Sequence, residues 1–263
     1  MLSSLFGSKM KEPDIEDLLA EAKALAERGE FEAALAIWGP LAHKGVARAA
    51  NNVGACFSGG LGVTRNLELA ARWLTIAAEA GDPAGQRNLA TAFFQGHGVE
   101  QNFQVALRWY RAAAEAGDAA AQDMLSWMLL EGGTIPGDPV EARRWAEAAA
   151  SQNVASAMTR MGMIYHDALG VERDATAAAS WWARAVEAGD ADAMAMLGAA
   201  NHLGQGVDRD SLRAMVLLIL ARQGGSGLAQ TFFGAVQASL PPGGFEQAGR
   251  LAASIQATRS PLR

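Results

Sequence analysis

The sequence predicts an all-α protein in which antiparallel helix pairs stack into a solenoid. Alanine, the residue with the highest helix propensity, is abundant, whereas Val, Ile, Thr and Tyr, which favour strands, are scarce. The sequence also repeats itself every 36 residues, and a period of this size is typical of repeat architectures. With 263 residues, the chain is long enough to bury a sizeable core.

The 36-residue period appears in five columns of the sequence. Trp73, Trp109, Trp145 and Trp181 follow one another at this spacing, and Leu217 holds the next place. Because five columns share one period without an insertion, chance does not explain the pattern. The other columns are Gly81, Gly117, Asn153, Gly189 and Gly225; Asn66, Asn102, Asp138, Asp174 and Asp210; Gly62, Gly98, Thr134, Gly170 and Gly206; and Ala70, Ala106, Ala142, Ala178 and Ala214.

Each repeat is expected to contain two helices. A residue such as Asn102 opens the second helix as its N-cap, because its side-chain oxygen accepts an otherwise unpaired backbone N–H. Gly117 lies where that helix must stop, since glycine adopts the left-handed conformation without a Cβ clash. In the second repeat we therefore expect helices over 84–95 and 103–116, joined by a loop over 96–101. Three acidic residues that follow the column glycines are expected to cap the next helix: Asp82, Asp118 and Asp190.

The loop that begins Gly96-His97-Gly98 has two interpretations. A glycine-rich loop before a helix can bind phosphate, which would indicate an enzyme. However, the same loop recurs five times with changing contents, as GLGV, GHGV, GTIP, ALGV and GQGV. A phosphate loop would be expected once, so these glycines are interpreted as turn residues between two helices.

With these columns in place, the chain resembles the Sel-1-like repeat family, a relative of the tetratricopeptide repeats. The resemblance implies a right-handed α-solenoid whose first helix in each repeat lines the inner surface, and it implies an adaptor-type function. Four positions depart from the family pattern: Thr134, Asn153, Asn201 and Leu217. The second repeat carries the family pattern in Gly85, Leu89, Ala90, Phe93, Gly96, Gly98, Val99, Asn102, Ala106, Trp109, Tyr110, Ala113, Ala114 and Gly117.

The two ends of the chain extend the same scheme. Residues 13–45 are expected to form a tetratricopeptide-like hairpin whose second helix kinks or ends at Gly39-Pro40. Five repeats over 46–226 follow, and then capping helices over 227–258 (227–240 and 245–258). The segments 1–12 and 259–263 are expected to be flexible or frayed.

Composition excludes several classes of protein. The formal net charge is −6, and Lys and Arg are scattered, so a nucleic-acid groove is not expected. The longest apolar run, AMVLLILA at 214–221, is too short to cross a membrane, and the amino-terminal stretch lacks the features of a cleaved signal peptide. Cys56 is the only cysteine, so no intramolecular disulfide can form, which favours the cytoplasm.

Helical spacing separates the core of each first helix from its opposite face. Leu89, Phe93, Leu125, Leu129, Met161 and Tyr165 are expected in the core, together with the tryptophan column, so that Trp109→Ala would cost about 3–5 kcal/mol. The opposite face should be polar in an amphipathic helix. Here it is apolar or aromatic at several positions, with Arg87 and Asp123 at its edge. Those positions are Phe94, Trp127, Leu130, Met163, His166 and His202.

This apolar face has two interpretations. Its residues either pack one repeat against the next, or they form an exposed groove that binds another protein or a peptide. His166 and His202 hold equivalent places in consecutive repeats, but two histidines without a third ligand are weak evidence for a metal. We expect no metal and no cofactor.

The predicted function is a non-catalytic scaffold that binds a partner peptide or helix, because no catalytic motif is present and Cys56 is expected to be an inert core thiol. The alternative is a hydrolase or ligand-binding protein that uses the cleft. A third possibility is self-association through the C-terminal helices.

Overall fold

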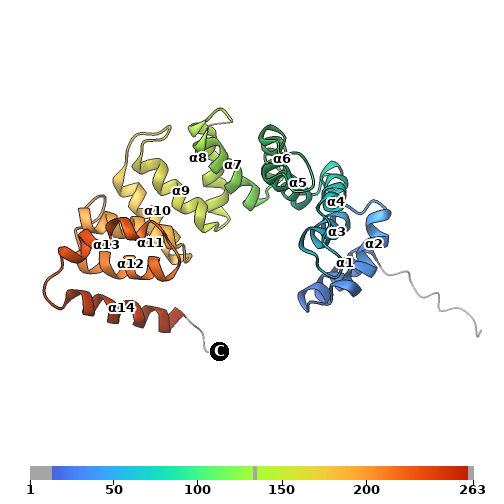
Figure 1. Cartoon of the computed structure of the whole chain (residues 1–263). Helices are drawn as coiled ribbons and strands as arrows, with labels where there is room; N and C mark the ends of the chain where they lie inside the picture. Colours follow the sequence, from blue (N-terminus) through green and yellow to red (C-terminus); the bar gives the residue numbers. More distant parts are fainter. Residues whose placement is uncertain (1–13, 133–134, 260–263) are drawn as a thin grey trace, which may run out of the picture. The chain divides into compact units, whose positions relative to one another are not determined.

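A computed structural model describes residues 14–132 and 135–259 of the chain. Over these residues the protein is an all-α solenoid with no β-strand, as predicted, and none of its described helices has the length and hydropathy of a transmembrane segment. Figure 1 shows the helices following one another along the chain. They are α1 (Ile15–Glu27), α2 (Phe31–His43), α3 (Ala47–Gly59), α4 (Leu67–Glu79), α5 (Pro83–Gln95), α6 (Phe103–Glu115), α7 (Ala119–Glu131), α8 (Pro139–Ser151), α9 (Ala155–His166), α10 (Ala175–Glu187), α11 (Ala191–Leu203), α12 (Ser211–Gln223), α13 (Ala229–Ala238) and α14 (Gly244–Arg259).

The chain divides into two compact units. Unit 1 ends at Asp118 and contains α1 to α6, whereas unit 2 begins at Ala119 and contains α7 to α14. We call the first helix of each repeat its A helix (α3, α5, α7, α9 and α11) and the second its B helix (α4, α6, α8, α10 and α12). Each A helix packs against the B helix of its own repeat, and A helices of neighbouring repeats also meet, α3 against α5 in unit 1 and α7 against α9 in unit 2.

The N-caps predicted from the Asn/Asp column are confirmed. The side chain of Asn66 accepts a hydrogen bond from the backbone N–H of Leu69 at 3.0 Å, and Asn102 does the same for Val105. Asp138, Asp174 and Asp210 cap α8, α10 and α12 in the same way. In the following loops, Asp82 and Asp190 cap α5 and α11.

The predicted helix ends are also confirmed. Gly117 follows α6 with φ +88°, and Asn153 adopts the same left-handed conformation in place of glycine, with φ +64°. The two helices of the second repeat, α5 and α6, begin and end within one residue of the predicted bounds. Thr134 lies outside the described residues.

A loop glycine comes into close contact with the preceding helix pair at several places in the described chain. Gly98 has φ +74°, and a Cβ atom at this position would collide with the backbone of Leu67 and lie 2.7 Å from the nitrogen of Glu68. These two residues form the first turn of α4, the B helix of the preceding repeat. Gly62 and Gly206 approach the first turns of α2 and α10 in the same way. The recurring glycine therefore meets protein backbone, which supports the turn interpretation of the loop.

The tryptophan column is less buried than predicted. Trp73, Trp109 and Trp181 are half-buried, and only Trp145 is buried, at 7 % exposure. The guanidinium of Arg184 lies 4.1 Å from the Trp181 ring centroid, a cation–π contact at the edge of the core. The prediction that Trp109 is a core residue is therefore wrong. The buried column is the next one along each B helix: Leu74, Tyr110, Ala146, Trp182 and Leu218.

The A-helix core was predicted more accurately. Leu89, Leu125, Leu129 and Met161 are buried, whereas Phe93 and Tyr165 are only half-buried. One position of each A helix carries a small residue, and we call Gly54, Ala90, Ser126, Gly162 and Gly198 the small column. Its glycines pack on the buried column of the B helices, and Gly162 lies directly on the Trp182 indole. Gly54 packs on Leu74 and Gly198 on Leu218 in the same way.

One member of the small column, Ser126, buries an unpaired hydroxyl, and its replacement should stabilise the protein. The Ser126 side chain is fully buried, and its Oγ has no hydrogen-bond partner among the described residues. A buried hydroxyl without a partner costs about 1–3 kcal/mol. We expect Ser126→Ala to raise the free energy of unfolding by about 1 kcal/mol in urea titration, because alanine occupies the same place in the second repeat.

Ser156→Ala is the matched control for this substitution. The Ser156 hydroxyl donates a hydrogen bond to Asp123 at 2.7 Å, so its removal should lower stability by up to about 1 kcal/mol. If both variants were destabilised equally, the lack of a partner for the Ser126 hydroxyl would not lower the free energy of unfolding.

The ends of the chain add one correction. The helix α2 does not end at Gly39-Pro40 but continues through Pro40 to His43. Proline removes one backbone donor only, and the Pro40 carbonyl still accepts from the N–H of Lys44 at 3.2 Å, so the last turn closes. The expectations for residues 1–12 and 260–263 lie outside the described residues, and α14 includes Arg259.

Candidate functional site

The predicted apolar residues lie along the A helices of the two units. Phe94 lies on α5 in unit 1 and packs edge-on against Phe103, with 5.3 Å between ring centroids. In unit 2, Trp127 and Leu130 on α7 are half-buried, and Leu130 contacts the core. Met163 on α9 is 39 % exposed, the most accessible member of the set. The face thus combines packing with exposed apolar surface.

Arg87 and Asp123 are held in ion pairs. The Arg87 Nε lies 3.1 Å from a carboxylate oxygen of Asp118, and Asp123 Oδ1 lies 3.0 Å from Arg160 Nη2. Asp123 also accepts the Ser156 hydrogen bond. At the same column position, Asn51 accepts a hydrogen bond from Asn88 at 2.8 Å, and Thr159 donates one to Asp190 at 2.9 Å. Asn51 and Asp123 therefore link their A helix to the A helix of the next repeat, as the packing interpretation expects, whereas Arg87 and Thr159 contact the acidic residue at the end of their own repeat.

The two histidines have separate partners. His166 Nδ1 lies 2.7 Å from Asp167 Oδ1, and its ring is 5.6 Å from that of Trp182. His202 Nδ1 lies 3.4 Å from the Ser239 hydroxyl. Within the described parts of the chain, no three His, Cys, Asp or Glu side chains gather as a metal site would require.

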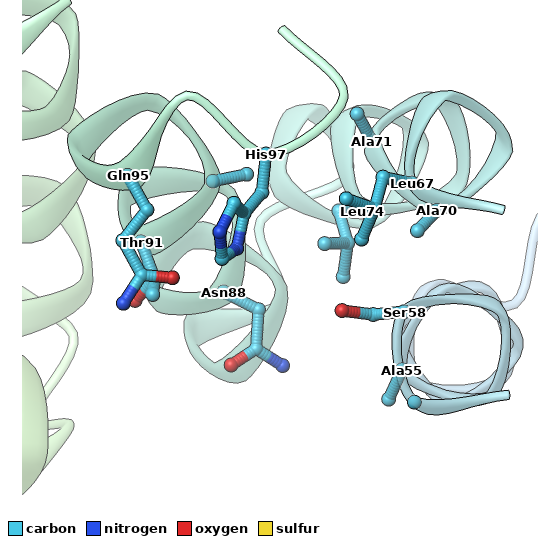
Figure 2. A pocket seen from close by; sticks show the side chains of 12 residues that line it. Ala55, Ser58, Leu67, Ala70, Ala71, Leu74, Asn88, Thr91, Gln95 and His97 are labelled. Atoms are coloured by element: carbon cyan, nitrogen blue, oxygen red, sulfur yellow. The ribbon is translucent and has the colours of Figure 1, made fainter. Parts of the chain in front are cut away.

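Sequence reasoning missed a cleft between the A helices of unit 1. This cleft has a volume of about 300 Å³, and we call it the α3/α5 cleft. Figure 2 shows Ala55 and Ser58 of α3 on one side, Asn88 and Thr91 of α5 on the other, and the α4 residues Leu67, Ala70, Ala71 and Leu74 above α3. The full lining is Ala55, Ser58, Gly59, Leu67, Ala70, Ala71, Leu74, Asn88, Thr91, Ala92, Gln95 and His97.

The α3/α5 cleft exists because its A-helix side chains are small. Ala55 and Ser58 occupy the positions that Trp127 and Leu130 hold two repeats later. The sequence carries this signal as a change from large to small residues at equivalent repeat positions, which shows only when the repeats are compared with one another. Thr91 is fixed in place, since its hydroxyl bonds to the Tyr110 hydroxyl at 2.8 Å and to the Arg87 carbonyl. Burial raises the pKa of Tyr110 above its ordinary value, so its hydroxyl stays protonated at neutral pH.

A second cleft of about 500 Å³ in unit 1 has Asn51 in its lining. It is lined by residues of α1, α2, α3 and the start of α5, including Trp38. The indole N–H of Trp38 is buried and has no hydrogen-bond partner in the described part of the chain. Charges of both signs line this cleft, among them the Arg48–Glu16 ion pair at 3.1 Å.

Cys56 and the α3/α5 cleft present few ionisable groups. Cys56 is 2 % exposed, and burial raises the pKa of its thiol, so little reactive thiolate forms at neutral pH. The lining of the α3/α5 cleft contains no Asp, Glu, Lys or Arg. Its polar groups are hydroxyls, amides and one imidazole, which suit hydrogen bonding to an uncharged ligand.

Comparison with known proteins identifies related chains. The Sel1 repeat family model matches residues 47–82, 83–118, 119–154, 155–190 and 191–226. A Sel1 repeat protein from Oxalobacter formigenes has a similar structure, with a TM-score of 0.77 and 25 % identity over 89 % of this chain and 98 % of that one. A protective antigen of uropathogenic Escherichia coli with an SLR fold gives a TM-score of 0.75 and 27 % identity over 92 % of this chain, which spans 56 % of that protein. No curated protein matches the chain.

Proposed function

This chain belongs to the Sel1 repeat family, and on that premise we propose that it is a non-catalytic scaffold that binds a peptide or helix of another protein on its A helices. Sel1 repeat proteins are generally protein-interaction scaffolds. A cytoplasmic location is part of the proposal, because the single buried cysteine suits a reducing compartment.

The observation that carries the proposal is the α3/α5 cleft. It is preformed by helices that are fixed on both sides, by the Asn51–Asn88 hydrogen bond and by the core beneath Leu74. A binding surface that is already ordered loses little conformational entropy when a partner docks. The apolar positions of the same helix set supply further contact area: Phe94 in unit 1, and Trp127, Leu130, Met163, His166 and His202 in unit 2.

The proposal predicts that removing two aromatic side chains abolishes partner capture. The purified full chain would be used to capture proteins from cell lysate, and the captured protein would then be purified and titrated against both forms. We expect Phe94→Ala/Trp127→Ala to weaken binding at least about tenfold, because aromatic residues carry much of the energy in such interfaces. Its Tm should stay within about 5 °C of the wild-type value.

Ile76→Ala serves as the control for this experiment, since Ile76 is 43 % exposed on the B helix α4, away from the A-helix face. This variant should bind like the wild type. If the double variant bound normally, the face would not be the docking surface. If it lost its cooperative unfolding transition, the aromatic residues would belong to the packing between repeats.

A further inference from the structure

We propose that the α3/α5 cleft receives an uncharged aromatic or long aliphatic side chain of an extended partner peptide, together with the peptide groups that flank it. This inference rests on the proposed scaffold function and assigns the chemistry of one part of the docking surface. Three features of unit 1 support it: the shape of the cleft, its hydrogen-bonding groups and its lack of charge.

The shape of the cleft follows from a comparison between repeats. The Asn51–Asn88 pair of unit 1 holds the same two positions as the Asp123–Arg160 pair of unit 2. The helix framework is therefore shared, yet Ala55 and Ser58 stand in unit 1 where Trp127 and Leu130 stand in unit 2. A volume of about 300 Å³ remains open where unit 2 carries large apolar side chains. An apolar side chain from a partner is the natural occupant of such a space.

The hydrogen-bonding groups of the cleft suit peptide backbone. Asn88 uses its Nδ2 to bond Asn51, which leaves its Oδ1 without a partner among the described residues. The Ser58 hydroxyl has no partner in that part of the chain either, and Figure 2 shows it directed across the space between α3 and α5. Asn88 turns its nitrogen toward α3 and its oxygen toward the side of Thr91 and Gln95. A peptide group offers one donor and one acceptor. The Asn88 oxygen can accept from its N–H, and the Ser58 hydroxyl can donate to its carbonyl.

The absence of charge limits the ligand further. No Asp, Glu, Lys or Arg lines the cleft, and the hydrogen-bonded pair that joins α3 to α5 beside it, Asn51–Asn88, is neutral. A charged ligand group would lose hydration without gaining an ion pair, which is unfavourable. In unit 2 the equivalent pair of α7 and α9, Asp123–Arg160, is an ion pair, so the same helix framework carries charge there and none here.

The test uses three small probes that share one phenylalanine ring and differ in the groups that flank it. N-acetyl-phenylalaninamide carries the ring between two neutral peptide groups, N-acetyl-phenylalanine replaces the terminal amide with a carboxylate, and phenylalaninamide replaces the acetylated amine with an ammonium group. Each would be titrated into the full-length protein while ¹H–¹⁵N NMR signals are followed. We expect the neutral probe to shift the signals of Ser58, Asn88 and His97 with a dissociation constant of about 1 mM, typical of a ligand of this size. Both charged probes should bind at least about fivefold more weakly.

A blocking variant identifies the site. Ala55→Trp/Ser58→Leu installs the residues that the third repeat already accommodates, and it should abolish the shifts while the protein stays folded. Ile76→Trp adds an aromatic side chain on the outside of α4 and should leave binding unchanged. Equal binding of all three probes, no binding of the neutral probe, or unchanged binding by the blocking variant would overturn the inference.

The two proposals fail separately. If the neutral probe does not bind but Phe94→Ala/Trp127→Ala still loses its protein partner, the scaffold function stands and only the assignment of the cleft is wrong. If the probe binds and the double variant retains its partner, the cleft is a ligand site but the wider face is not the docking surface.

Discussion

Gly98→Ala is expected to destabilise the protein by about 4 kcal/mol, an unusually large effect for the addition of one methyl group. Two costs combine. The residue has φ +74°, which costs an alanine about 1–2 kcal/mol. The new Cβ would also collide with the backbone of Leu67 in the first turn of α4, and backbone cannot rotate away as a side chain can. The Tm should fall by about 10 °C.

Gly117→Ala separates these two costs. Gly117 has a similar left-handed conformation, with φ +88°, but a Cβ atom there would have no neighbour within 4 Å. This variant should lose only about 1–2 kcal/mol, the cost of the backbone conformation. Urea titration of both variants measures the difference between them. If both variants lost the same free energy of unfolding, the close contact with α4 would not be the reason that position 98 requires glycine.

Gly162→Ala and Trp182→Ala are the second pair of substitutions with large effects. A Cβ atom at position 162 would overlap the Trp182 indole and lie 2.7 Å from its Cε2, so Gly162→Ala should cost about 2–3 kcal/mol through overpacking. Trp182 is 2 % exposed, and its Nε1 donates to the Thr159 carbonyl at 3.2 Å. Trp182→Ala should therefore cost about 3–5 kcal/mol.

The double variant Gly162→Ala/Trp182→Ala tests whether these effects share one contact. Without the indole, the added methyl group has space, so the double variant should be no less stable than Trp182→Ala alone. This corresponds to a coupling energy of about 2 kcal/mol between the two sites. Additive losses in urea titration would show that Gly162 is required for a reason other than the space taken by Trp182. Trp109→Ala, at a half-buried position, should cost less than Trp182→Ala.

The sequence was sufficient to predict the fold class because local signals and the repeat agree. Asn102 and Gly117 mark the start and the end of a helix through backbone hydrogen bonding alone, so their roles can be read from neighbouring residues. The burial of Trp109 was predicted wrongly for a different reason. A conserved spacing along the chain does not say which of two adjacent columns faces the core, and Tyr110 is the buried one.

The candidate site could be predicted only in part. The positions of Phe94 and Met163 on the A helices follow from helical spacing, but Arg87 pairs with Asp118, which lies 31 residues later, and no local pattern indicates that contact. The α3/α5 cleft was not predicted, because a cavity forms where side chains are small and a small side chain gives no signal by itself. Ala55 and Ser58 are ordinary helix residues when read singly, and they become informative only beside Trp127 and Leu130.

The approach of each loop glycine to the preceding B helix has a consequence for how the array can change in length. Gly98 contacts the first turn of α4, and Gly206 contacts that of α10. A single inserted residue would break such a contact and shift the register of the hairpins that follow. Duplication or loss of a complete 36-residue module keeps all of these contacts. Such proteins are therefore expected to diversify in whole-module steps, while binding surfaces vary by exchange of side chains within a fixed frame.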